Sequence, residues 1–343
     1  MIEVKNLTKR YGGTTAVDDL TFTVEPGVVT GFLGPNGAGK STTMRMIVGL
    51  DNPTSGEALV DGKPYRSLEH PIRKVGCLLD ATWVHANRSA GGHLRMMAAA
   101  GGVPKARVDE VLGLVGLSDV AGKRVGGFSL GMRQRLGLAT AMLGDPEVLI
   151  FDEPVNGLDP EGIVWIRRFM HARAAEGRTV LVSSHLLSEM SQTAQDLVVI
   201  GRGKVRAQSS VDEFVSRATS SVVFRTPHVA EFESAAREEG LGVTRDPHTG
   251  AFLLENVSAE QVGDLAATYG LTVHELSERR ASLEEAFMAL TDGDVQYHGT
   301  DRAETAPPAG STAPPAGSTA APAGPAPEAP GHPTDDDARR GQL

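Results

Sequence analysis

The fold of this chain is decided by one stretch, Gly34-Pro35-Asn36-Gly37-Ala38-Gly39-Lys40-Ser41, which has the spacing G-x-x-x-x-G-K-[ST]. An apolar run at residues 28–33 precedes it, and a helical pattern opens at Ser41-Thr42 and runs towards residue 50. A strand, a Gly-rich loop and a helix in this order form a phosphate-binding loop, because backbone N–H groups can approach phosphate oxygens there. A Gly-rich turn without a ligand is the competing interpretation, which this context disfavours. We expect Lys40 to reach the β- and γ-phosphates of a nucleotide and Ser41 to bind Mg²⁺.

Two further apolar runs end in polar residues. Residues 148–151 lead into Asp152 and Glu153, and residues 180–182 are followed shortly by His185. A buried strand delivers the residues after it to the carboxyl edge of a parallel sheet, where α/β proteins bind ligands. Asp152 is suited to the Mg²⁺ shell, whereas Glu153 points to the opposite face of the strand and could polarise an attacking water. The alternative is a pair of solvated carboxylates and an ordinary histidine.

Three regions of the chain differ in pattern. Residues 1–214 alternate short apolar runs with helical stretches, which predicts an α/β domain with a largely parallel sheet. Residues 215–293 predict a small α+β module. Residues 294–343 repeat Ala-Pro-Pro-Ala-Gly-Ser-Thr and contain almost no large apolar residues, so we expect a disordered tail.

The small module has the order βαββαβ followed by a last helix, which is the order of a ferredoxin-like domain. Ser258-x-x-Gln261 and Ser282-x-x-Glu285 have the form of capping boxes and mark two helix starts. The other predicted elements are a strand at 221–224, a helix at 229–239, two strands around the turn at 246–250 and a strand at 271–276.

Composition limits the class of protein. The formal net charge of −10 argues against a protein that mainly binds nucleic-acid phosphates. Cys77 is the single cysteine and lies in an apolar run, so we expect a buried small side chain and neither an internal disulfide nor a Cys-rich zinc site. No export signal and no run of about 18 apolar residues are found, which predicts a cytoplasmic polypeptide that reaches a membrane only through a partner.

Together these residues resemble the ATP-binding cassette (ABC) family over residues 1–214. The stretch Phe128-Ser129-Leu130-Gly131-Met132-Arg133-Gln134-Arg135 resembles the family's L-S-G-G-Q signature, and Asn156-Gly157-Leu158-Asp159 resembles its D-loop. The resemblance implies the P-loop NTPase fold of an ABC nucleotide-binding domain, with ATP and Mg²⁺ as cofactors. It also implies that Tyr11 stacks on adenine, that His185 senses the γ-phosphate, and that Glu153 activates water.

The resemblance further implies that two cassettes pair head to tail, so that Ser129 and Gly131 of one contact the γ-phosphate bound to the other. A homodimer is expected, and Arg133 and Arg135 are expected in the first turn of the helix that follows. Three positions depart from the family. Asp80 stands where the Q-loop glutamine is usual, and an ionised Asp only accepts hydrogen bonds, which puts its contacts to metal and partner in doubt. Leu130 and Met132 stand where Gly and Gln are usual.

Such variants resemble the ATPases of bacterial drug and antibiotic exporters. This resemblance implies a separately encoded transmembrane permease subunit and a position of the chain on the inner face of the membrane. It also implies that motion is transmitted to the permease through residues 80–93. His85 and His93 fit no standard metal-ligand spacing and are expected on the surface. One alternative is a soluble ABC-type ATPase that acts on ribosomes or DNA, although one phosphate loop and the lack of a long coiled coil disfavour it. A regulatory role for the C-terminal module is another.

Overall fold

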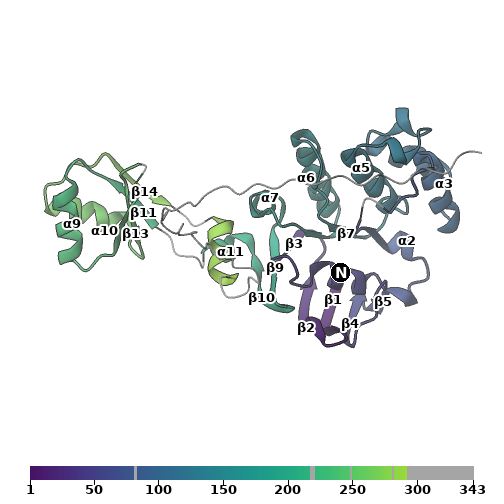
Figure 1. The fold of residues 1–343 in the computed structure, drawn as a ribbon, viewed down its shortest axis with the longest axis horizontal. Coiled ribbons are helices and arrows are strands. Elements are labelled where there is room, and N and C mark those ends of the chain that lie inside the picture. Colours follow the sequence, from purple (N-terminus) through teal and green to yellow (C-terminus); the bar gives the residue numbers. More distant parts are fainter. Residues whose placement is uncertain (81–82, 217–220, 248, 280–281, 292–343) are drawn as a thin grey trace, which may run out of the picture. The chain divides into compact units, whose positions relative to one another are not determined.

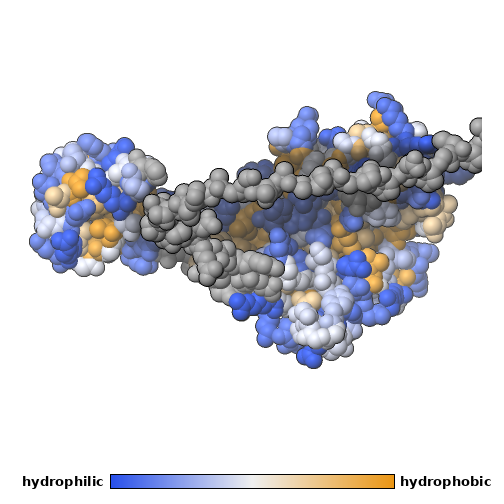
Figure 2. All heavy atoms as spheres, in the orientation of Figure 1, coloured by the Kyte–Doolittle hydropathy of each residue, from blue (hydrophilic) through white to orange (hydrophobic). Residues whose placement is uncertain are grey.

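The computed structural model describes residues 1–80, 83–216, 221–247, 249–279 and 282–291, and the predicted tail at 294–343 lies outside them. The described residues form a part with two sheets, from β1 to β10, and a module with a third sheet, from β11 to β14 (Figure 1). Most side chains on the face drawn in Figure 2 are hydrophilic, with smaller apolar patches between them. Across the described ranges, no helix is long and apolar enough to cross a bilayer.

A six-stranded sheet carries the strand ends that the sequence singles out. Its order is β10-β9-β3-β8-β7-β6, and all neighbours are parallel except β9 and β10. The predicted parallel α/β sheet is therefore confirmed. Because β3, β8 and β7 run in the same direction, their carboxyl ends meet at one edge of the sheet. The strands are β3 (Val29–Leu33), β6 (Val75–Leu78), β7 (Val148–Asp152), β8 (Thr179–Ser183), β9 (Asp196–Gly201) and β10 (Lys204–Ser210).

A second, antiparallel sheet packs against helix α1 (Lys40–Ile47) and has the order β2-β1-β4-β5. One buried cluster joins this sheet to α1 and the central sheet, and the rings of Phe22 and Phe32 within it lie 5.4 Å apart. Cys77 packs against the same cluster as a partly buried side chain, so the expected burial is incomplete, and desolvation raises the pKa of its thiol to about 11. The strands are β1 (Ile2–Tyr11), β2 (Thr14–Val24), β4 (Ser55–Val60) and β5 (Lys63–Pro64).

Helices pack on the central sheet, and one of them, α5, begins within the stretch that resembles the signature. Helix α5 packs on the edge strand β6, where a Cβ atom built on Gly76 would meet the Ala141 carbonyl oxygen at 2.1 Å. Only glycine permits this approach. The helices are α2 (Pro71–Lys74), α3 (Ala90–Ala100), α4 (Ala106–Leu114), α5 (Leu130–Ala141), α6 (Pro160–Ala175), α7 (Leu187–Thr193) and α8 (Val211–Ser216), with short 3-10 turns at Tyr65–Ser67, Ser118–Val120 and Val125–Gly127.

We expect Gly76→Ala to lower the free energy of unfolding by about 3 kcal/mol, because the new methyl overlaps a backbone carbonyl that can move only with α5. Urea denaturation of the purified chain measures this change. Gly122→Ala is the matched control, since nothing lies within 4 Å of its Cβ position and its backbone is unstrained; there the change should stay below about 0.5 kcal/mol. Equal stability of the two variants would contradict the packing argument.

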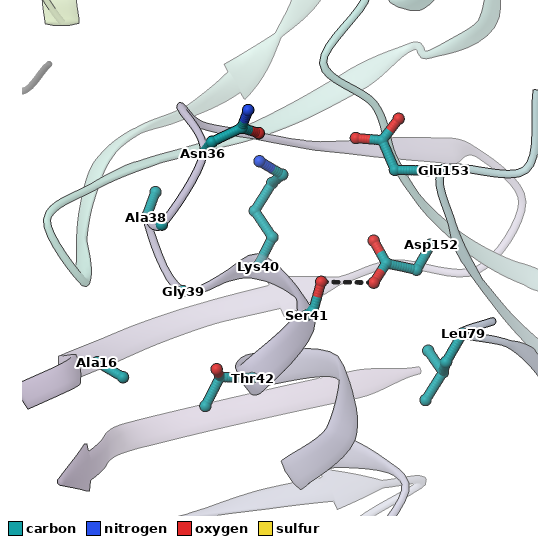
Figure 3. A pocket seen from close by; sticks show the side chains of 11 residues that line it. Ala16, Asn36, Ala38, Gly39, Lys40, Ser41, Thr42, Leu79, Asp152 and Glu153 are labelled. Atoms are coloured by element: carbon teal, nitrogen blue, oxygen red, sulfur yellow. Dashed lines mark hydrogen bonds between the residues drawn. The ribbon is translucent and has the colours of Figure 1, made fainter. Parts of the chain in front are cut away.

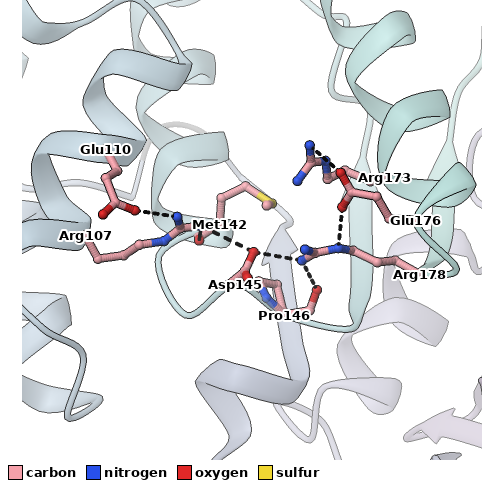
Figure 4. A network of polar contacts seen from close by, with 8 residues as sticks. All are labelled: Arg107, Glu110, Met142, Asp145, Pro146, Arg173, Glu176 and Arg178. Atoms are coloured by element: carbon pink, nitrogen blue, oxygen red, sulfur yellow. Dashed lines mark hydrogen bonds and ion pairs between the residues drawn. The ribbon is translucent and has the colours of Figure 1, made fainter.

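A polar network fastens α4 to the loop before β7 and to the start of β8 (Figure 4). The Asp145 carboxylate accepts from Arg107 of α4 at 3.3 Å and from Arg178 at 2.9 Å. Arg178 also donates to the carbonyl oxygen of Pro146 at 2.8 Å and to Glu176 at 3.0 Å. The backbone of Asp145 is left-handed, with φ +55°, a conformation that Asp tolerates better than most residues. One carboxylate thus links a helix of the peripheral layer to the central sheet.

The C-terminal module has the predicted strand and helix order. Its four strands are all antiparallel in the order β12-β13-β11-β14, and the rings of Phe224, Phe232 and Phe252 meet at centroid distances of 4.4 and 4.7 Å in its core. The Ser258–Gln261 capping box is present with both hydrogen bonds. The elements are β11 (Ser221–Arg225), α9 (Val229–Glu238), β12 (Val243–Arg245), β13 (Phe252–Glu255), α10 (Ala259–Thr268) and β14 (Glu275–Arg279).

The last strand of the module begins later than predicted. A strand over 271–276 is wrong at its start, because β14 begins at Glu275. Gly270 adopts φ +64°, and the N–H of Leu271 donates to the carbonyl oxygen of Ala266 at 2.8 Å, which closes the end of α10. Leu271 is buried with the module core as part of this helix end. In the sequence alone, an apolar residue at the C-terminal end of a helix therefore looks the same as the first residue of a strand.

The final helix, α11 (Leu283–Thr291), packs on α7 and α8. Its predicted capping box is formed, since the Ser282 hydroxyl accepts from Glu285 N and the Glu285 carboxylate accepts from Ser282 N. Leu283, Ala286 and Phe287 are buried in the same apolar cluster as the central sheet and its helices. The chain thus returns after the small module to complete the core of the first part.

Candidate nucleotide site

The phosphate loop lies between β3 and α1, as predicted. Gly39 is the residue before α1 and adopts φ +105°, and a Cβ atom there would meet the Ala16 carbonyl oxygen at 2.6 Å. Both facts require glycine at this position. The first N–H groups of α1 have no partner within the helix and face the loop. The arrangement therefore presents backbone donors and a helix N-terminus to an anion.

Lys40 points into the cavity beside this loop (Figure 3). Its side chain is only 8% exposed, and Nζ donates to the carbonyl oxygens of Gly34 at 2.6 Å and Pro35 at 3.3 Å. Desolvation lowers the pKa of the amine, and the nearby charges of Glu153 and Asp152 act in the opposite direction. A buried ammonium whose partners include neutral carbonyls is well suited to a more anionic ligand.

Ser41 and Asp152 come together from different parts of the sequence. The Ser41 hydroxyl donates to Asp152 Oδ2 at 2.6 Å (Figure 3). A hydroxyl and a carboxylate within this distance, next to a phosphate loop, form the oxygen donor set that Mg²⁺ prefers. These residues therefore fit a magnesium ion bound together with a phosphate ligand.

Glu153 follows β7 with a left-handed backbone, φ +51°, which is rare for a residue that is neither Gly nor Asn or Asp. Its Oε2 atom lies 2.7 Å from Nδ1 of His185, which comes from the end of β8. The structure thus brings together two residues that the sequence placed at separate strand ends. Strained backbone of this kind is concentrated at functional sites.

The phosphate loop, Asp152 and Glu153 border one cavity of about 340 Å³, whereas His185 is not part of its lining. Phosphate-loop residues, the acidic strand end and one residue from each of two other segments line it, namely Ala16, Asn36, Gly37, Ala38, Gly39, Lys40, Ser41, Thr42, Leu79, Asp152 and Glu153. The floor of the cavity is cationic and rich in N–H donors, and its side carries two carboxylates. Such a site can hold a polyphosphate with a divalent cation.

Other predicted site residues lie outside this lining. Tyr11 is 49% exposed, its hydroxyl donates to Asp51 at 3.2 Å, and the Lys9 ammonium lies 4.9 Å from the centre of its ring. Asp80 follows Leu79 at the end of β6 but does not itself border the cavity.

Ser129, Gly131 and Asp159 lie around a different cavity, of about 440 Å³. Ser129 is the N-cap of α5, and its hydroxyl accepts from Met132 N at 3.2 Å. Asp159 caps α6 in the same way, through Gly162 N at 2.9 Å. Two helix N-termini therefore face this second cavity.

Helix α5 begins at Leu130, which changes the place of two arginines. Arg135 is the sixth residue of the helix and not part of its first turn, and it lines the second cavity. Arg133 donates to the Gly126 carbonyl oxygen at 3.3 Å. The expectation that both lie in the first turn is therefore wrong, because the helix starts two residues earlier than the apolar pattern indicates.

Gln134 is a site residue that sequence reasoning missed. It is buried, and its Nε2 donates to the carbonyl oxygen of Asn156 at 3.2 Å and lies 3.5 Å from that of Glu153. The signature helix is thereby joined to the turn that follows the acidic strand. Gln134 lies between Arg133 and Arg135, so nothing in the local pattern sets it apart.

The prediction that His85 and His93 are surface residues holds for His85 and is wrong for His93. His93 lies one turn into α3 and is 1% exposed, with the Trp83 ring against it at a centroid distance of 5.2 Å. Among the described residues, neither ring nitrogen has a hydrogen-bond partner. Burial, and to a lesser extent Arg88, lowers the pKa of this imidazole.

Known protein families match two parts of the chain. The ABC transporter family matches residues 17–156, and a domain family of unknown function, DUF8746, matches residues 220–284. The uncharacterized ABC transporter ATP-binding protein YhcH of Bacillus subtilis is 38% identical over 85% of this chain and 96% of its own length. The bacitracin transport ATP-binding protein BcrA of Bacillus licheniformis is 36% identical over 85% of this chain and 98% of its own length. The daunorubicin/doxorubicin resistance ATP-binding protein DrrA of Streptomyces peucetius is 33% identical over 88% of this chain and 96% of its own length.

Solved structures share the fold of the first part. The ATP-binding subunit of an ABC transporter is 28% identical, with a TM-score of 0.59 over 63% of this chain and 92% of that one. A dimeric ATP-binding cassette in a post-hydrolysis state with ADP and Pi is 22% identical, with a TM-score of 0.56 over 62% and 99%, and shows likeness of fold alone.

Proposed function

This chain belongs to the family of ABC transporter ATP-binding proteins, and from that premise we propose that it hydrolyses ATP to drive an exporter whose channel is a separate membrane polypeptide. The observation that carries the proposal is the meeting of Lys40, the Ser41–Asp152 pair and Glu153 around one cavity. Relatives named for bacitracin transport and for daunorubicin/doxorubicin resistance support a drug-like, antibiotic-like or otherwise amphipathic cargo.

The chemistry follows from the positions of the side chains. The phosphate-loop N–H groups and Lys40 bind the β- and γ-phosphates. Ser41 and Asp152 would hold Mg²⁺, which would supply positive charge against the phosphate oxygens. Glu153 orients a water and accepts its proton, and His185, 2.7 Å away, holds Glu153 in place and reaches the γ-phosphate. Catalysis of this kind depends mainly on positioning and on stabilisation of charge.

The second cavity supports head-to-tail pairing of two cassettes, for which we propose a homodimer. Ser129 and Gly131 border a cavity that is distinct from the one around Lys40, so they are available to a nucleotide bound by another copy. Asp159 stands beside them. Tyr11 has half of its surface free to stack on adenine. We assign Asp80, which follows Leu79 of the cavity lining, to a contact with the metal shell or with the partner.

We place the cassette at residues 1–214, the accessory module at 215–293 and the tail at 294–343, with no role for nucleic acid. On this view the chain lies in the cytoplasm against the inner face of the membrane, held there by the permease. The buried contacts of α11 with α7 and α8 support treating α11 as the attachment of the module to the cassette.

Replacing residues 221–279 with a flexible Gly-Ser linker while retaining α11 is expected to leave ATP hydrolysis within about twofold and to reduce transport at least tenfold, if the module couples the cassette to its partner. Both activities are measured on the reconstituted transporter. A variant with a linker of the same composition inserted after Gly242, in the exposed loop before β12, serves as the control. Full transport without the module would contradict a coupling or regulatory role.

The assignment as a transporter subunit is tested by affinity purification of the Glu153→Gln variant with ATP from detergent extracts of its native cells. Recovery of a multi-span membrane protein without an ATPase domain of its own supports the proposal. Recovery of ribosomes or DNA-bound proteins in place of a membrane partner would be consistent with ATP hydrolysis by this chain but would contradict its assignment to an exporter.

A further inference from the structure

Ser183 is the last residue of β8 and has no exposed surface. It pairs in register with Asp152 on the neighbouring strand β7. Its hydroxyl oxygen lies 2.5 Å from Asp152 Oδ1 and 3.0 Å from the backbone nitrogen of Glu153. One buried hydroxyl therefore touches both acidic residues of the nucleotide site, although the nucleotide cavity itself does not include it.

The direction of these two hydrogen bonds is fixed by chemistry. The Glu153 N–H can only donate, so Ser183 Oγ accepts from it, and the single hydroxyl proton of Ser183 is left for Asp152. The two oxygens of the Asp152 carboxylate then have different partners, because Oδ1 accepts from Ser183 and Oδ2 faces Ser41 at 2.6 Å. The carboxylate is held at one end, and Oδ2 is the atom on the side of the phosphate loop.

The bond to Glu153 acts on a strained backbone. Glu153 adopts φ +51°, a left-handed conformation that residues with a Cβ rarely adopt. Ladder hydrogen bonds of β7 end at this point, so the Glu153 N–H would otherwise be a half-buried donor without a partner. Its acceptor is Ser183, two residues before His185, whose imidazole contacts the Glu153 carboxylate. The end of β8 thus holds Glu153 by its backbone and by its side chain.

We propose that Ser183 is a positioning residue that orients the metal-binding carboxylate of Asp152 and the water-activating Glu153 through one hydroxyl group. This inference rests on the proposed ATPase function. Without the hydroxyl, Asp152 gains freedom to rotate away from Ser41, and the turn at Glu153 loses the acceptor that stabilises it. Binding of Mg²⁺ with nucleotide weakens, whereas binding of the phosphates by the loop and Lys40 does not depend on this contact.

The test compares the affinity of a non-hydrolysable ATP analogue in Mg²⁺ and in EDTA, measured by calorimetry on the full chain. For Ser183→Ala we expect the dissociation constant in Mg²⁺ to rise roughly tenfold, as for a lost hydrogen bond to a charged group, and the constant in EDTA to change by less than about twofold. We also expect kcat to fall at least tenfold. Ser183→Thr, which keeps the hydroxyl, should recover most of the Mg²⁺-dependent affinity.

Ser184→Ala is the matched control. Ser184 is the adjacent residue and is 3% exposed, and its hydroxyl forms hydrogen bonds with the backbone of Leu186. Removal of this hydroxyl should leave the ratio of the dissociation constants in Mg²⁺ and in EDTA unchanged. A Ser183→Ala protein that unfolds at a lower temperature but keeps the wild-type ratio would reduce Ser183 to a structural residue and overturn the inference. Failure of the proposed function looks different, because the wild-type chain itself would then bind no nucleotide.

Discussion

Replacing Glu153 with Gln should lower kcat for ATP hydrolysis by roughly 10³-fold, within the range found for removal of a general base. The amide keeps the shape of the side chain but cannot accept a proton from water. Binding of ATP should change by less than about twofold, because the phosphate contacts come from the loop and from Lys40. Steady-state hydrolysis and equilibrium nucleotide binding on the same preparation measure both quantities.

Glu147→Gln provides the control for this experiment. Glu147 lies directly before β7, at the end of the strand opposite to Glu153, and its carboxylate forms an exposed ion pair with Lys74 at 2.7 Å. Its neutralisation should leave kcat within about twofold, since exposed ion pairs contribute little. Undiminished hydrolysis by Glu153→Gln would remove Glu153 from its role and would point to water activation by the γ-phosphate itself or by His185.

Lys40→Ala should reduce kcat/KM for MgATP by at least about 100-fold, because a buried ammonium supplies charge-assisted hydrogen bonds to phosphates that strengthen as the reaction proceeds. Lys40→Arg should not restore activity, since the planar guanidinium does not fit a site where the lysine is 8% exposed. Initial rates over a range of ATP concentrations separate the effects on kcat and KM. Lys74→Ala removes an exposed lysine elsewhere and should leave both parameters unchanged.

The protonation of Lys40 adds a dependence on pH. The protonated amine is the form that binds phosphate, and desolvation lowers its pKa from the ordinary value. Affinity for MgATP should therefore decline as pH rises, and should do so at a lower pH than an unperturbed lysine would require. Lys40→Ala should lack this decline. An affinity curve of the same shape in both proteins would contradict the assignment to Lys40.

The parts of the site that the sequence predicts are those in which a local pattern has one physical meaning. The glycines and Lys40 of the phosphate loop need only the adjacent strand and helix, and Asp152 and Glu153 need only the end of a buried strand. Ser183 and Gln134 are different, because their importance comes from a neighbouring strand and a distant turn. A serine in a β-strand and a glutamine in a helix have many ordinary explanations until the pairing of β7 with β8 is known.

The errors in the fold have the same origin. His93 has a polar side chain, and only the packing of α3 against Trp83 shows that it is buried. Leu271 closes a helix, yet its apolar neighbours resemble a strand. In both cases tertiary contacts override the local preference of the residue, which sequence periodicity cannot register.

The return of α11 to the first part of the chain also affects how the protein is made. During synthesis the cassette emerges first, but the apolar surfaces of α7 and α8 stay uncovered until Leu283, Ala286 and Phe287 have left the ribosome. The small module, between Ser221 and Arg279, can collapse around its own phenylalanines in the meantime. Completion of the nucleotide-binding part is therefore tied to completion of nearly the whole described chain, and a nascent chain stalled within the module exposes surface on which chaperones act.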